Sequence, residues 1–440
     1  MIYEINGGRP LRGECRVQGS KNSALPILAC TLLCGGETVI RNCPVLSDVE
    51  ATLRILRHLG CRVKREGHIV TVDSTAVTSD EIPDVLMREM RSSVIFLGAI
   101  LARNGSATLS TPGGCEIGLR PIDLHLDAMR RLGAQVREEF GRIVCEAPNG
   151  LTGANISLSF PSVGATENIM IAAACAKGVT RIANAAREPE ISDLADFLNS
   201  CGARIAGAGE GSVTVEGVPR LHPTEHTVIP DRIVAATYMA AAAVTGGAIR
   251  LRSIIPAHLG PEIAVLEEAG CRIESDCRNL RLTAPKRLSG VKMIRTMPYP
   301  GFPTDIQAPF AAMLTAAEGT SVIIETIFEN RYKYIGELVR FGARIRVDGR
   351  MAVIDGVEKL YGANVVMPDL RGGAALMIAG LAAEGTTRIS GVRHIDRGYE
   401  TPEQVLSGLS ADVKRIEEDG KTDPEQQSEP HRRQGEPLAR

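Results

Sequence analysis

The chain has 440 residues, of which 44% are hydrophobic and 23% charged, a composition typical of a soluble globular protein with two or three domains. The net charge of −2 excludes a broad electrostatic attraction to nucleic acid or to an anionic membrane, so an anionic ligand must be held by local groups of cations. Aromatic residues make up only 3% and tryptophan is absent, which argues against stacking platforms for nucleic-acid bases.

The eleven cysteines are scattered, and no two of them form a CxxC pair. Because the first segment, MIYEINGGRP, also lacks the features of a secretory signal, we expect reduced thiols and a cytoplasmic protein. Apolar runs such as ATYMAAAAV are too short and too rich in alanine to span a bilayer, so no membrane insertion is expected. Residues 417–440 are almost free of apolar side chains, which predicts a disordered polar tail.

A unit of about 70 residues recurs six times along the chain. Each unit gives an apolar helix, a glycine, a β-branched strand, an amphipathic second helix and further strands. The glycines that open these strands are 66 to 73 residues apart: Gly36, Gly105, Gly178, Gly247, Gly319 and Gly385. The first helix is apolar nearly all round, and one unit is too small to bury it alone. We therefore expect the units to share cores, most simply as two groups of three.

The second helix of each unit ends at a small-residue motif, and the sixth motif, LSA, has Ser410 in place of the usual glycine. The stretch 215–231, VEGVPRLHPTEHTVIPD, is the best candidate for the crossing between the two groups. Its His222 and His226 have a spacing seen in metal sites, but Pro223 and the absence of a helical pattern argue against metal binding. The glycine-rich segment 207–211 joins two predicted strands, so it indicates a hairpin turn instead of a nucleotide loop.

Charged residues recur at two equivalent places in the units. The starts of the buried helices carry Lys21, Arg91, Asp231, Asp305, Asp369 and Arg371, and the strand–helix loops carry Cys115, Arg120, Arg187, Glu329, Arg331, Asp396 and Arg397. Taken singly, each charge is best explained by solvent exposure or capping, and Asp231, Asp305 and Asp369 are typical capping residues. If the units converge, these positions meet in a cleft between two domains, where helix N-termini favour anions. A cluster of cations there predicts a multiply charged substrate and closure on binding.

The loop TPGGCEIGLRPIDLH, residues 111–125, places a cysteine beside glycines and an arginine. Cys115 follows two glycines and lies five residues before Arg120, whereas Cys30 lies in an apolar run typical of a structural cysteine. A thiol next to a cation has a lowered pKa and is reactive. From this loop alone, a reactive thiol and a tight turn that happens to contain cysteine are equally supported.

Eight motifs in order give the chain a resemblance to a known family. GSKNSALP, GGCEIGLRPIDLH, SVGATEN, AAREPEI, FPTDIQA, FENR, PDLR and HIDRGYE together resemble the UDP-N-acetylglucosamine enolpyruvyl transferases over residues 1–416. The resemblance implies an α/β protein with a two-domain inside-out α/β barrel and three units in each domain. It implies a discontinuous first domain from residues 1–20 and 230–416, a second domain from 21–229 that carries the Cys115 loop, and the tail 417–440.

The resemblance also implies a reaction. The enolpyruvyl group of phosphoenolpyruvate would be transferred to the 3-hydroxyl of UDP-N-acetylglucosamine by addition and elimination, with release of phosphate, in the first committed step of peptidoglycan synthesis. The two substrates are the expected partners. No metal, organic cofactor, nucleic acid or obligate protein partner is implied.

Roles follow from the positions that match the family's motifs. Lys21, Arg120 and Arg397 would bind the phosphate and carboxylate of phosphoenolpyruvate, with Arg91 and Arg371 near by, and Asn22 would orient the reacting centre. Asp305 would accept the proton of the sugar hydroxyl, and Cys115 would protonate the methylene carbon and be open to alkylation by an epoxide such as fosfomycin. The nucleotide sugar would be held by Arg120, Pro121, Ile122, Asp123, Leu124, Ser162, Val163, Gly164 and Ile327. Glu329, Arg331 and Asp369 complete the predicted substrate-binding set.

Two departures and two alternatives remain open. Ser47 and Phe160 stand where some family members have lysines, so the uridyl contacts are expected to differ in detail. A 5-enolpyruvylshikimate-3-phosphate synthase would have the same architecture, but the cysteine loop and GSKNSALP tell against it. A catalytically silent relative that binds the sugar nucleotide as a regulator has no chemical need for Cys115, Asp305, Lys21 and Arg397 together.

Overall fold

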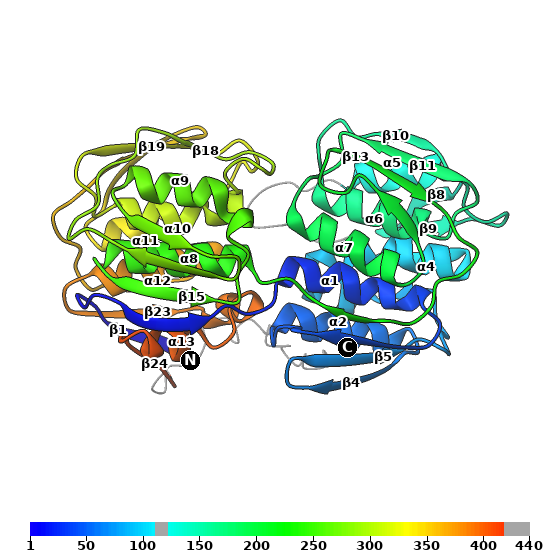
Figure 1. Ribbon diagram of the computed structural model, residues 1–440, viewed down its shortest axis with the longest axis horizontal. Helices are drawn as coiled ribbons and strands as arrows, with labels where there is room; N and C mark the ends of the chain where they lie inside the picture. The colour runs from blue at the N-terminus through cyan, green and yellow to red at the C-terminus, as the bar shows by residue number, and fades with distance from the viewer. Residues whose placement is uncertain (111–121, 418–440) are drawn as a thin grey trace, which may run out of the picture.

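The computed structural model describes residues 1–110 and 122–417, which form two lobes side by side (Figure 1). One apolar core runs from Ala24 to Val228 and belongs to the second lobe. The other combines residues 3–17 with residues 233–413 and belongs to the first lobe. The predicted tail lies outside the described residues, apart from residue 417. No helix within the described ranges is long and apolar enough to cross a membrane.

Each lobe has three central helices that pack against one another. They are α1 (Lys21–Cys30), α4 (Phe96–Asn104) and α6 (Val163–Ala173) in the second lobe, and α8 (Arg232–Val244), α10 (Thr304–Leu314) and α12 (Leu370–Ala382) in the first. These helices are apolar nearly all round, and every residue of α8 except Val244 is buried. The prediction of buried first helices is confirmed.

Six four-stranded sheets surround the central helices. In the second lobe, one sheet has the strand order β14 (Glu225–Thr227), β3 (Glu37–Arg41), β5 (Ile69–Asp73), β4 (Arg62–Glu66). The next has the order β6 (Glu81–Ile82), β7 (Ser106–Ser110), β9 (Arg142–Glu146), β8 (Gln135–Glu139). The third has the order β10 (Asn155–Ser157), β11 (Val179–Ala183), β13 (Ser212–Glu216), β12 (Arg204–Ala206). In the first lobe, one sheet has the strand order β16 (Arg272–Ser275), β17 (Asn279–Thr283), β15 (Ala248–Arg252), β2 (Arg12–Arg16). The next has the order β18 (Ile294–Arg295), β19 (Thr320–Ile324), β21 (Met351–Asp355), β20 (Arg344–Asp348). The third has the order β22 (Asn364–Val366), β23 (Thr386–Ser390), β1 (Ile2–Asn6), β24 (Asp412–Ile416). Each sheet has one parallel edge pair and is otherwise antiparallel.

The amphipathic second helices complete the units. They are α2 (Ser47–His58), α5 (Asp123–Arg131), α7 (Pro189–Ser200), α9 (Gly260–Glu268), α11 (Ile335–Arg340) and α13 (Pro402–Gly408); α3 (Asp84–Glu89) is an additional short helix. All six predicted glycines immediately precede a strand, at β3, β7, β11, β15, β19 and β23. Helices inside and sheets outside give an inside-out α/β barrel in two lobes, as expected.

The residue that follows the C-cap of each second helix has a left-handed backbone conformation, and this includes Ser410, which replaces the glycine of the sixth unit. The residue after each cap is left-handed, with φ of 102°, 95°, 96°, 97° and 90° at Gly60, Gly133, Gly202, Gly270 and Gly342. Ser410 adopts the same conformation with φ of 73°. A serine there is strained relative to glycine, but the helix terminates in the same way.

The chain passes between the lobes twice, and the two segments run side by side (Figure 1). Ser20 N donates to Ile229 O at 2.8 Å, and Asp231 N donates to Gln18 O at 2.9 Å. The predicted crossing at 215–231 was too long. Most of it belongs to the second lobe, because β14 pairs in parallel with β3 and completes its sheet, and only the last residues pass over. The segment 207–211 turns between the antiparallel strands β12 and β13, as predicted.

Candidate active site

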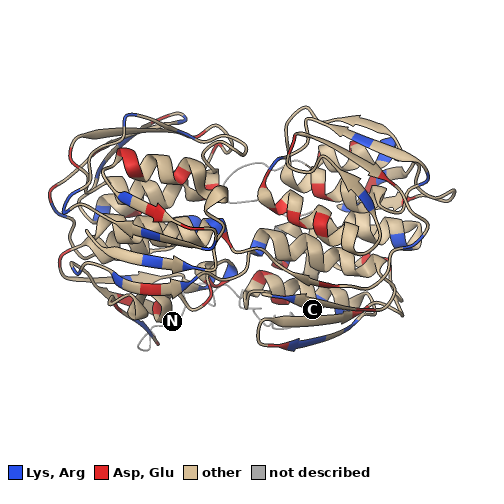
Figure 2. Ribbon diagram, viewed as in Figure 1, with Lys and Arg blue, Asp and Glu red and all other residues tan. Residues whose placement is uncertain are grey.

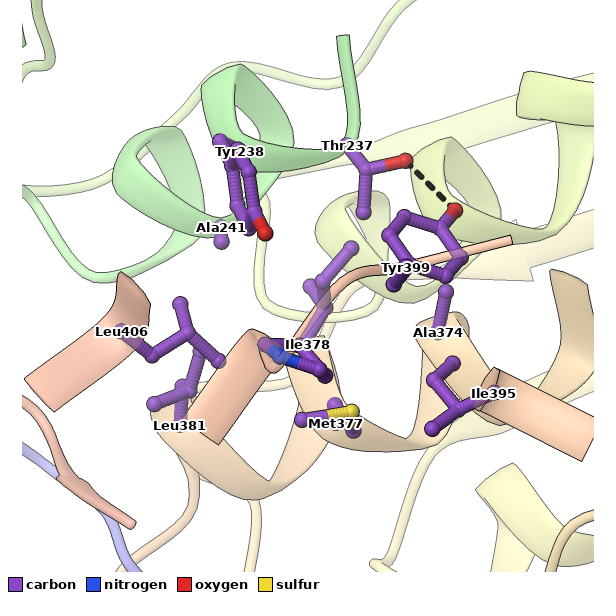
Figure 3. Close-up of a pocket in the computed structure, with 11 residues that line it drawn as sticks. Thr237, Tyr238, Ala241, Ala374, Met377, Ile378, Leu381, Ile395, Tyr399 and Leu406 are labelled. Carbon is purple, nitrogen blue, oxygen red and sulfur yellow. Dashed lines mark hydrogen bonds between the residues drawn. The ribbon is translucent and has the colours of Figure 1, made fainter. Parts of the chain in front are cut away.

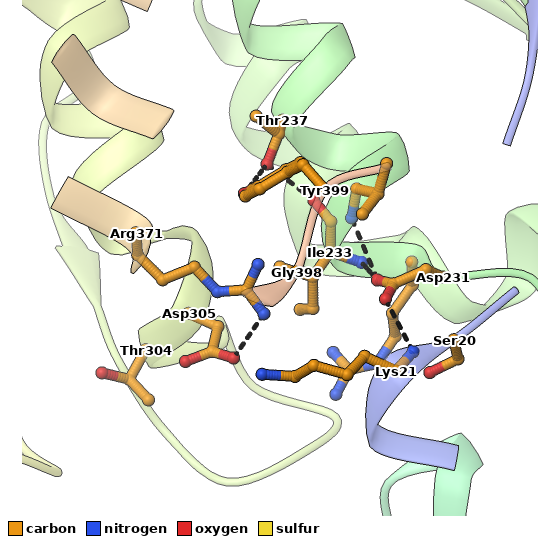
Figure 4. Close-up of polar contacts among 12 residues, drawn as sticks. Ser20, Lys21, Asp231, Ile233, Thr237, Thr304, Asp305, Arg371, Gly398 and Tyr399 are labelled. Atoms are coloured by element: carbon orange, nitrogen blue, oxygen red, sulfur yellow. Dashed lines mark hydrogen bonds and ion pairs between the residues drawn. The ribbon is translucent and has the colours of Figure 1, made fainter. Parts of the chain in front are cut away.

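Figure 2 shows charged residues along the ribbon on both sides of the boundary between the lobes. Among them, Lys21, Asp305 and Arg371 lie in the first turns of α1, α10 and α12. Lys21 is the first residue of α1, directly after the N-cap Ser20. Its backbone N donates to Asp231 Oδ2 at 3.1 Å, and its side chain extends toward Asp305 and Arg371 (Figure 4). The Lys21 side chain is only 12% exposed. Burial lowers the pKa of its ammonium, and Arg371 and Arg397 act in the same direction.

Asp305 lies between two buried arginines. Its Oδ1 accepts from Arg331 Nη2 at 2.9 Å, and its Oδ2 accepts from Arg371 Nη2 at 3.0 Å. The two arginine side chains are 3% and 4% exposed, whereas the Asp305 side chain is 28% exposed. The arginines and Lys21 hold the pKa of Asp305 far below its usual range, against the opposing effect of burial.

The capping prediction holds for two of the three aspartates and is wrong for Asp305. Asp231 and Asp369 are the N-caps of α8 and α12, and each accepts two backbone N–H bonds from the first turn of its own helix. The N-cap of α10 is Pro303, and the carboxylate of Asp305 turns instead to the arginines. Asp305 is therefore the carboxylate that the helix start leaves available for chemistry.

Two donors of the buried Arg371 side chain are unsatisfied within the described residues. Its Nε and Nη1 are buried and have no hydrogen-bond partner among the residues that the structure describes, and its guanidinium lies 5.5 Å from the centre of the Tyr399 ring. Unsatisfied buried donors beside a second buried guanidinium favour an anionic ligand at this position.

Tyr399 also borders a small apolar cavity of about 20 Å³, between α8, α12 and α13 (Figure 3). Its hydroxyl lies 2.9 Å from Thr237 Oγ1, and the remaining lining is mostly aliphatic. The cavity has room for about one water molecule, which makes it a packing gap of the first lobe and not a substrate site.

Arg397 reaches the cluster through a residue that the sequence analysis missed. Arg397 ends the 3-10 helix η4 (Val392–Arg397), and its Nε donates to Asp48 Oδ1 at 2.9 Å. Asp48 Oδ2 accepts from Lys21 Nζ at 3.2 Å. Asp48 is the second residue of α2, a place equivalent to the strand–helix loops in which other charges were noted. Its position in the repeated unit could therefore have marked it as a candidate site residue.

Some of the residues predicted to hold the nucleotide sugar lie together at the starts of α5 and α6. Ile122 is the N-cap of α5, followed by the exposed Asp123 and the half-buried Leu124. Ser162 caps α6 by accepting from Ala165 N at 3.3 Å. The two helix starts adjoin, because a side chain added at Gly164 would lie 3.2 Å from His125. Val163 lies between Ser162 and Gly164 and is half-buried like them.

Most of the remaining predicted residues have no hydrogen bond or ion pair to the cluster in the described part of the chain, or lie outside it. Asn22 and Ile327 are half-buried, Phe160 is 44% exposed, and Ser47 begins α2. Glu329 accepts from Arg350 Nη2 at 3.1 Å on an exposed surface, so the structure does not bring it to the cluster. Arg91 begins the 3-10 helix η2 (Arg91–Ile95). Cys115, Arg120 and Pro121 lie outside the described residues, and their roles stay predictions.

A second buried cluster joins the lobes beside Asp231. Arg232 Nε donates to Glu190 Oε1 at 3.0 Å, across the two lobes. Glu262 on α9 is 1% exposed, and neither of its oxygens has a hydrogen-bond partner within the described part of the chain. Burial raises the pKa of Glu262 to about 7, although Arg232 opposes the shift.

Glu262 predicts a pH-dependent stability. Because its pKa in the fold lies above the ordinary value for glutamate, the native state binds the extra proton, and this contribution to stability is lost as the pH rises from about 4.5 to 7. Glu262→Gln should therefore raise the thermal midpoint at pH 8 relative to the wild type and leave it nearly unchanged at pH 4.5. Glu267→Gln, on the exposed face of the same helix, is the control. A lower midpoint for Glu262→Gln at pH 8 would mean that Glu262 is ionised and stabilised by Arg232.

Comparisons with known proteins identify the family. The profile of the EPSP synthase (3-phosphoshikimate 1-carboxyvinyltransferase) family matches residues 5–406. A UDP-N-acetylglucosamine 1-carboxyvinyltransferase 2 of Caldanaerobacter subterraneus is 54% identical, over 94% of this chain and 99% of that protein. The UDP-N-acetylglucosamine 1-carboxyvinyltransferase of Geobacter metallireducens is 49% identical over the same shares of the two chains.

Solved structures show the same architecture. The enolpyruvyl transferase NikO from Streptomyces tendae superposes with a TM-score of 0.85 at 28% identity, over 94% of this chain and 98% of that one. An EPSP synthase from Acinetobacter baumannii superposes with a TM-score of 0.70 at 19% identity, over 94% of this chain and all of that one, which shows a shared fold. The chain therefore belongs to the EPSP synthase family of enolpyruvyl transferases, and within it to the UDP-N-acetylglucosamine 1-carboxyvinyltransferases.

Proposed function

We propose that this protein transfers the enolpyruvyl group of phosphoenolpyruvate to the 3-hydroxyl of UDP-N-acetylglucosamine and releases phosphate, the first committed step of peptidoglycan synthesis. The observation that carries the proposal is the carboxylate of Asp305, held between the buried Arg331 and Arg371 and faced by Lys21. One carboxylate among three cations provides a base beside a site for a highly charged anion.

The reaction divides into an addition and an elimination. In the addition, Cys115 gives a proton to the methylene carbon of phosphoenolpyruvate, the sugar hydroxyl forms the new C–O bond at the neighbouring carbon, and Asp305 takes the hydroxyl proton. In the elimination, the Cys115 thiolate takes a proton back from the methyl group, the double bond returns and the C–O bond to phosphate breaks, while the proton held by Asp305 leaves with the departing phosphate. Lys21, Arg371 and Arg397 would stabilise the negative charge that develops on the phosphate.

The pairing of Asp305 with Arg331 and Arg371 implies that substrate binding activates the base. A carboxylate paired with two guanidinium groups is a weak base, because both hydrogen bonds favour its ionised form. When the phosphate and carboxylate of phosphoenolpyruvate share those arginines, their hold on Asp305 weakens and its pKa rises. The order of events would then be anion binding first and proton abstraction second.

The compartment and the partners are part of the proposal. All ten cysteines in the described ranges are unpaired thiols, which fits a reducing cytoplasm. Phosphoenolpyruvate and UDP-N-acetylglucosamine are the proposed substrates, and the chemistry above assigns no step to a metal or an organic cofactor.

Phosphate release measured with different acceptors tests the function. Purified protein is given phosphoenolpyruvate with UDP-N-acetylglucosamine, with shikimate 3-phosphate, or with no acceptor. Phosphate should appear only with the nucleotide sugar. Release with shikimate 3-phosphate would support the rival transferase, whereas binding of the nucleotide sugar without any phosphate release would support a silent regulator.

Cys115→Asp should separate acid catalysis from alkylation. A carboxyl near a substrate phosphate can have its pKa raised enough to donate a proton, so substantial activity should remain, with an optimum at lower pH. A carboxylate attacks an epoxide far more slowly than a thiolate, so the variant should resist labelling. Activity and mass spectrometry after fosfomycin treatment are measured on both forms. Wild-type label on a cysteine other than Cys115 would contradict the assigned role.

A further inference from the structure

Asp48 occupies the space between two cations that come from different lobes. Its Oδ2 accepts from Lys21 Nζ of the second lobe, and its Oδ1 accepts from Arg397 Nε of the first lobe. The Asp48 side chain is 3% exposed, so each oxygen is committed to one cation and neither is solvated freely. The carboxylate thus connects the two cations directly, at 3.2 Å and 2.9 Å.

The charges around Lys21 indicate an electrostatic role for the Asp48 carboxylate in addition to its packing. The groups that face the Lys21 ammonium are Asp48 from α2, Arg371 from α12, Arg397 from η4 and Asp305 from α10. Asp305 is itself shared by Arg371 and Arg331. Asp48 is therefore the carboxylate with a hydrogen bond to Lys21 Nζ, in surroundings where burial and two guanidinium groups favour loss of the lysine proton.

We propose that Asp48 is a positioning residue for the transfer reaction: it is a built-in counter-ion that keeps Lys21 protonated and aligns Lys21 with Arg397 across the two lobes. The inference rests on the proposed function for its kinetic consequences. It assigns Asp48 no contact with the reacting atoms, since the residue acts through the two cations that bind the substrate anion.

The role has two opposite consequences for phosphoenolpyruvate. Asp48 competes with the substrate anion for Lys21 and Arg397, so its charge does not favour binding. It also keeps the ammonium charged at alkaline pH and holds both cations in register, which favours turnover. A variant with a neutral residue at this position should bind phosphoenolpyruvate at least as well as the wild type at pH 6.5 but turn it over more slowly. As the pH rises, its activity should begin to fall at a lower pH than that of the wild type.

Asp48→Asn is the main variant, because it keeps the shape of the side chain and removes its charge. We expect kcat at pH 6.5 to fall by about tenfold or more with the KM for phosphoenolpyruvate unchanged or lower. The alkaline limb of kcat/KM should move to lower pH by about one unit or more, as expected for loss of a partner of opposite charge. Asp48→Glu retains the charge on a longer side chain, so its alkaline limb should stay at the wild-type pH while kcat falls.

Glu50→Gln is the matched control. Glu50 also lies in the first turn of α2 and pairs with an arginine, at 2.7 Å from Arg65, but that pair lies within the second lobe. This variant should leave the alkaline limb in place. A uniform loss of activity at every pH in Asp48→Asn, or an equal shift in Glu50→Gln, would overturn the proposal and leave Asp48 a structural residue.

A titration that needs no turnover distinguishes this inference from the proposed function. The protein is labelled with [13Cε]lysine, and the Lys21 resonance is assigned by its loss in Lys21→Arg. Its pKa should be lower in Asp48→Asn than in the wild type and unchanged in Glu50→Gln; an unchanged value in Asp48→Asn would overturn the inference even if the activity is as proposed. If the wild type releases no phosphate, the proposed function fails, and the titration still decides the counter-ion role. If Asp48→Asn does not fold, Asp48→Glu decides: the inference stands only if its Lys21 pKa and alkaline limb match the wild type while kcat falls.

Discussion

Asp305→Asn should lower kcat by about 10²- to 10⁴-fold, the range expected for loss of a general base. The dissociation constant for UDP-N-acetylglucosamine should stay within about tenfold of the wild-type value, because the base acts chiefly in the transition state. Isothermal titration with the nucleotide sugar and a phosphate-release assay measure the two quantities separately.

The surroundings of Asp305 call for a control on folding. Asparagine keeps the shape of the side chain but leaves Arg331 and Arg371 without their shared counter-charge, so part of any loss reflects displaced arginines. The thermal midpoint of the variant reports this effect, and Asp355→Asn, which removes a surface partner of Arg346, shows the cost of an exposed ion pair. If nucleotide-sugar affinity collapses together with turnover, Asp305 is mainly a binding residue.

Lys21→Gln should reduce kcat/KM for phosphoenolpyruvate by about 10²- to 10³-fold, as expected when one donor to a developing anion is removed. Lys21 is largely buried and extends toward the Asp305–Arg371 pair. The affinity for UDP-N-acetylglucosamine should change little. The variant also leaves Asp48 paired only with Arg397, which draws that guanidinium away from the substrate anion.

Lys177→Gln is the control for Lys21, because Lys177 only donates to a backbone oxygen on an exposed surface. Steady-state rates with phosphoenolpyruvate as the varied substrate give the comparison. A loss smaller than tenfold in Lys21→Gln would contradict a direct role of the ammonium at the phosphate, and an equal loss in Lys177→Gln would show a non-specific effect of charge.

The repeated unit could be predicted from the sequence because its features depend on residues that are close together in the chain. The glycine before each strand, the apolar first helix and the left-handed position after the second helix are determined by neighbouring residues, and even Ser410 adopts the expected conformation. The crossing at 215–231 was placed with the wrong extent because strand β14 gains its partner, β3, from a segment far earlier in the chain.

The site could be predicted only where a residue occupies a helix start or a strand–helix loop of the repeated unit. Lys21, Asp305, Arg331, Arg371 and Arg397 come together as expected. The place of Asp48 in the unit could mark it as a candidate, but its pairing with Arg397, like that of Glu190 with Arg232, could not be predicted, since each pair joins residues of different lobes. The capping prediction failed for Asp305 because two arginines, one of them 66 residues away, compete for its carboxylate more effectively than backbone N–H groups do.

The most direct test of the transfer reaction is the product formed in deuterated water. Protein, phosphoenolpyruvate and UDP-N-acetylglucosamine are incubated in D₂O, and the nucleotide sugar is analysed by mass spectrometry and NMR. Addition and elimination predict an enolpyruvyl ether at the 3-oxygen with deuterium in its methylene group, because the carbon is protonated from an exchangeable acid before it loses a proton. An enolpyruvyl ether without deuterium, or an unmodified nucleotide sugar, would contradict the account.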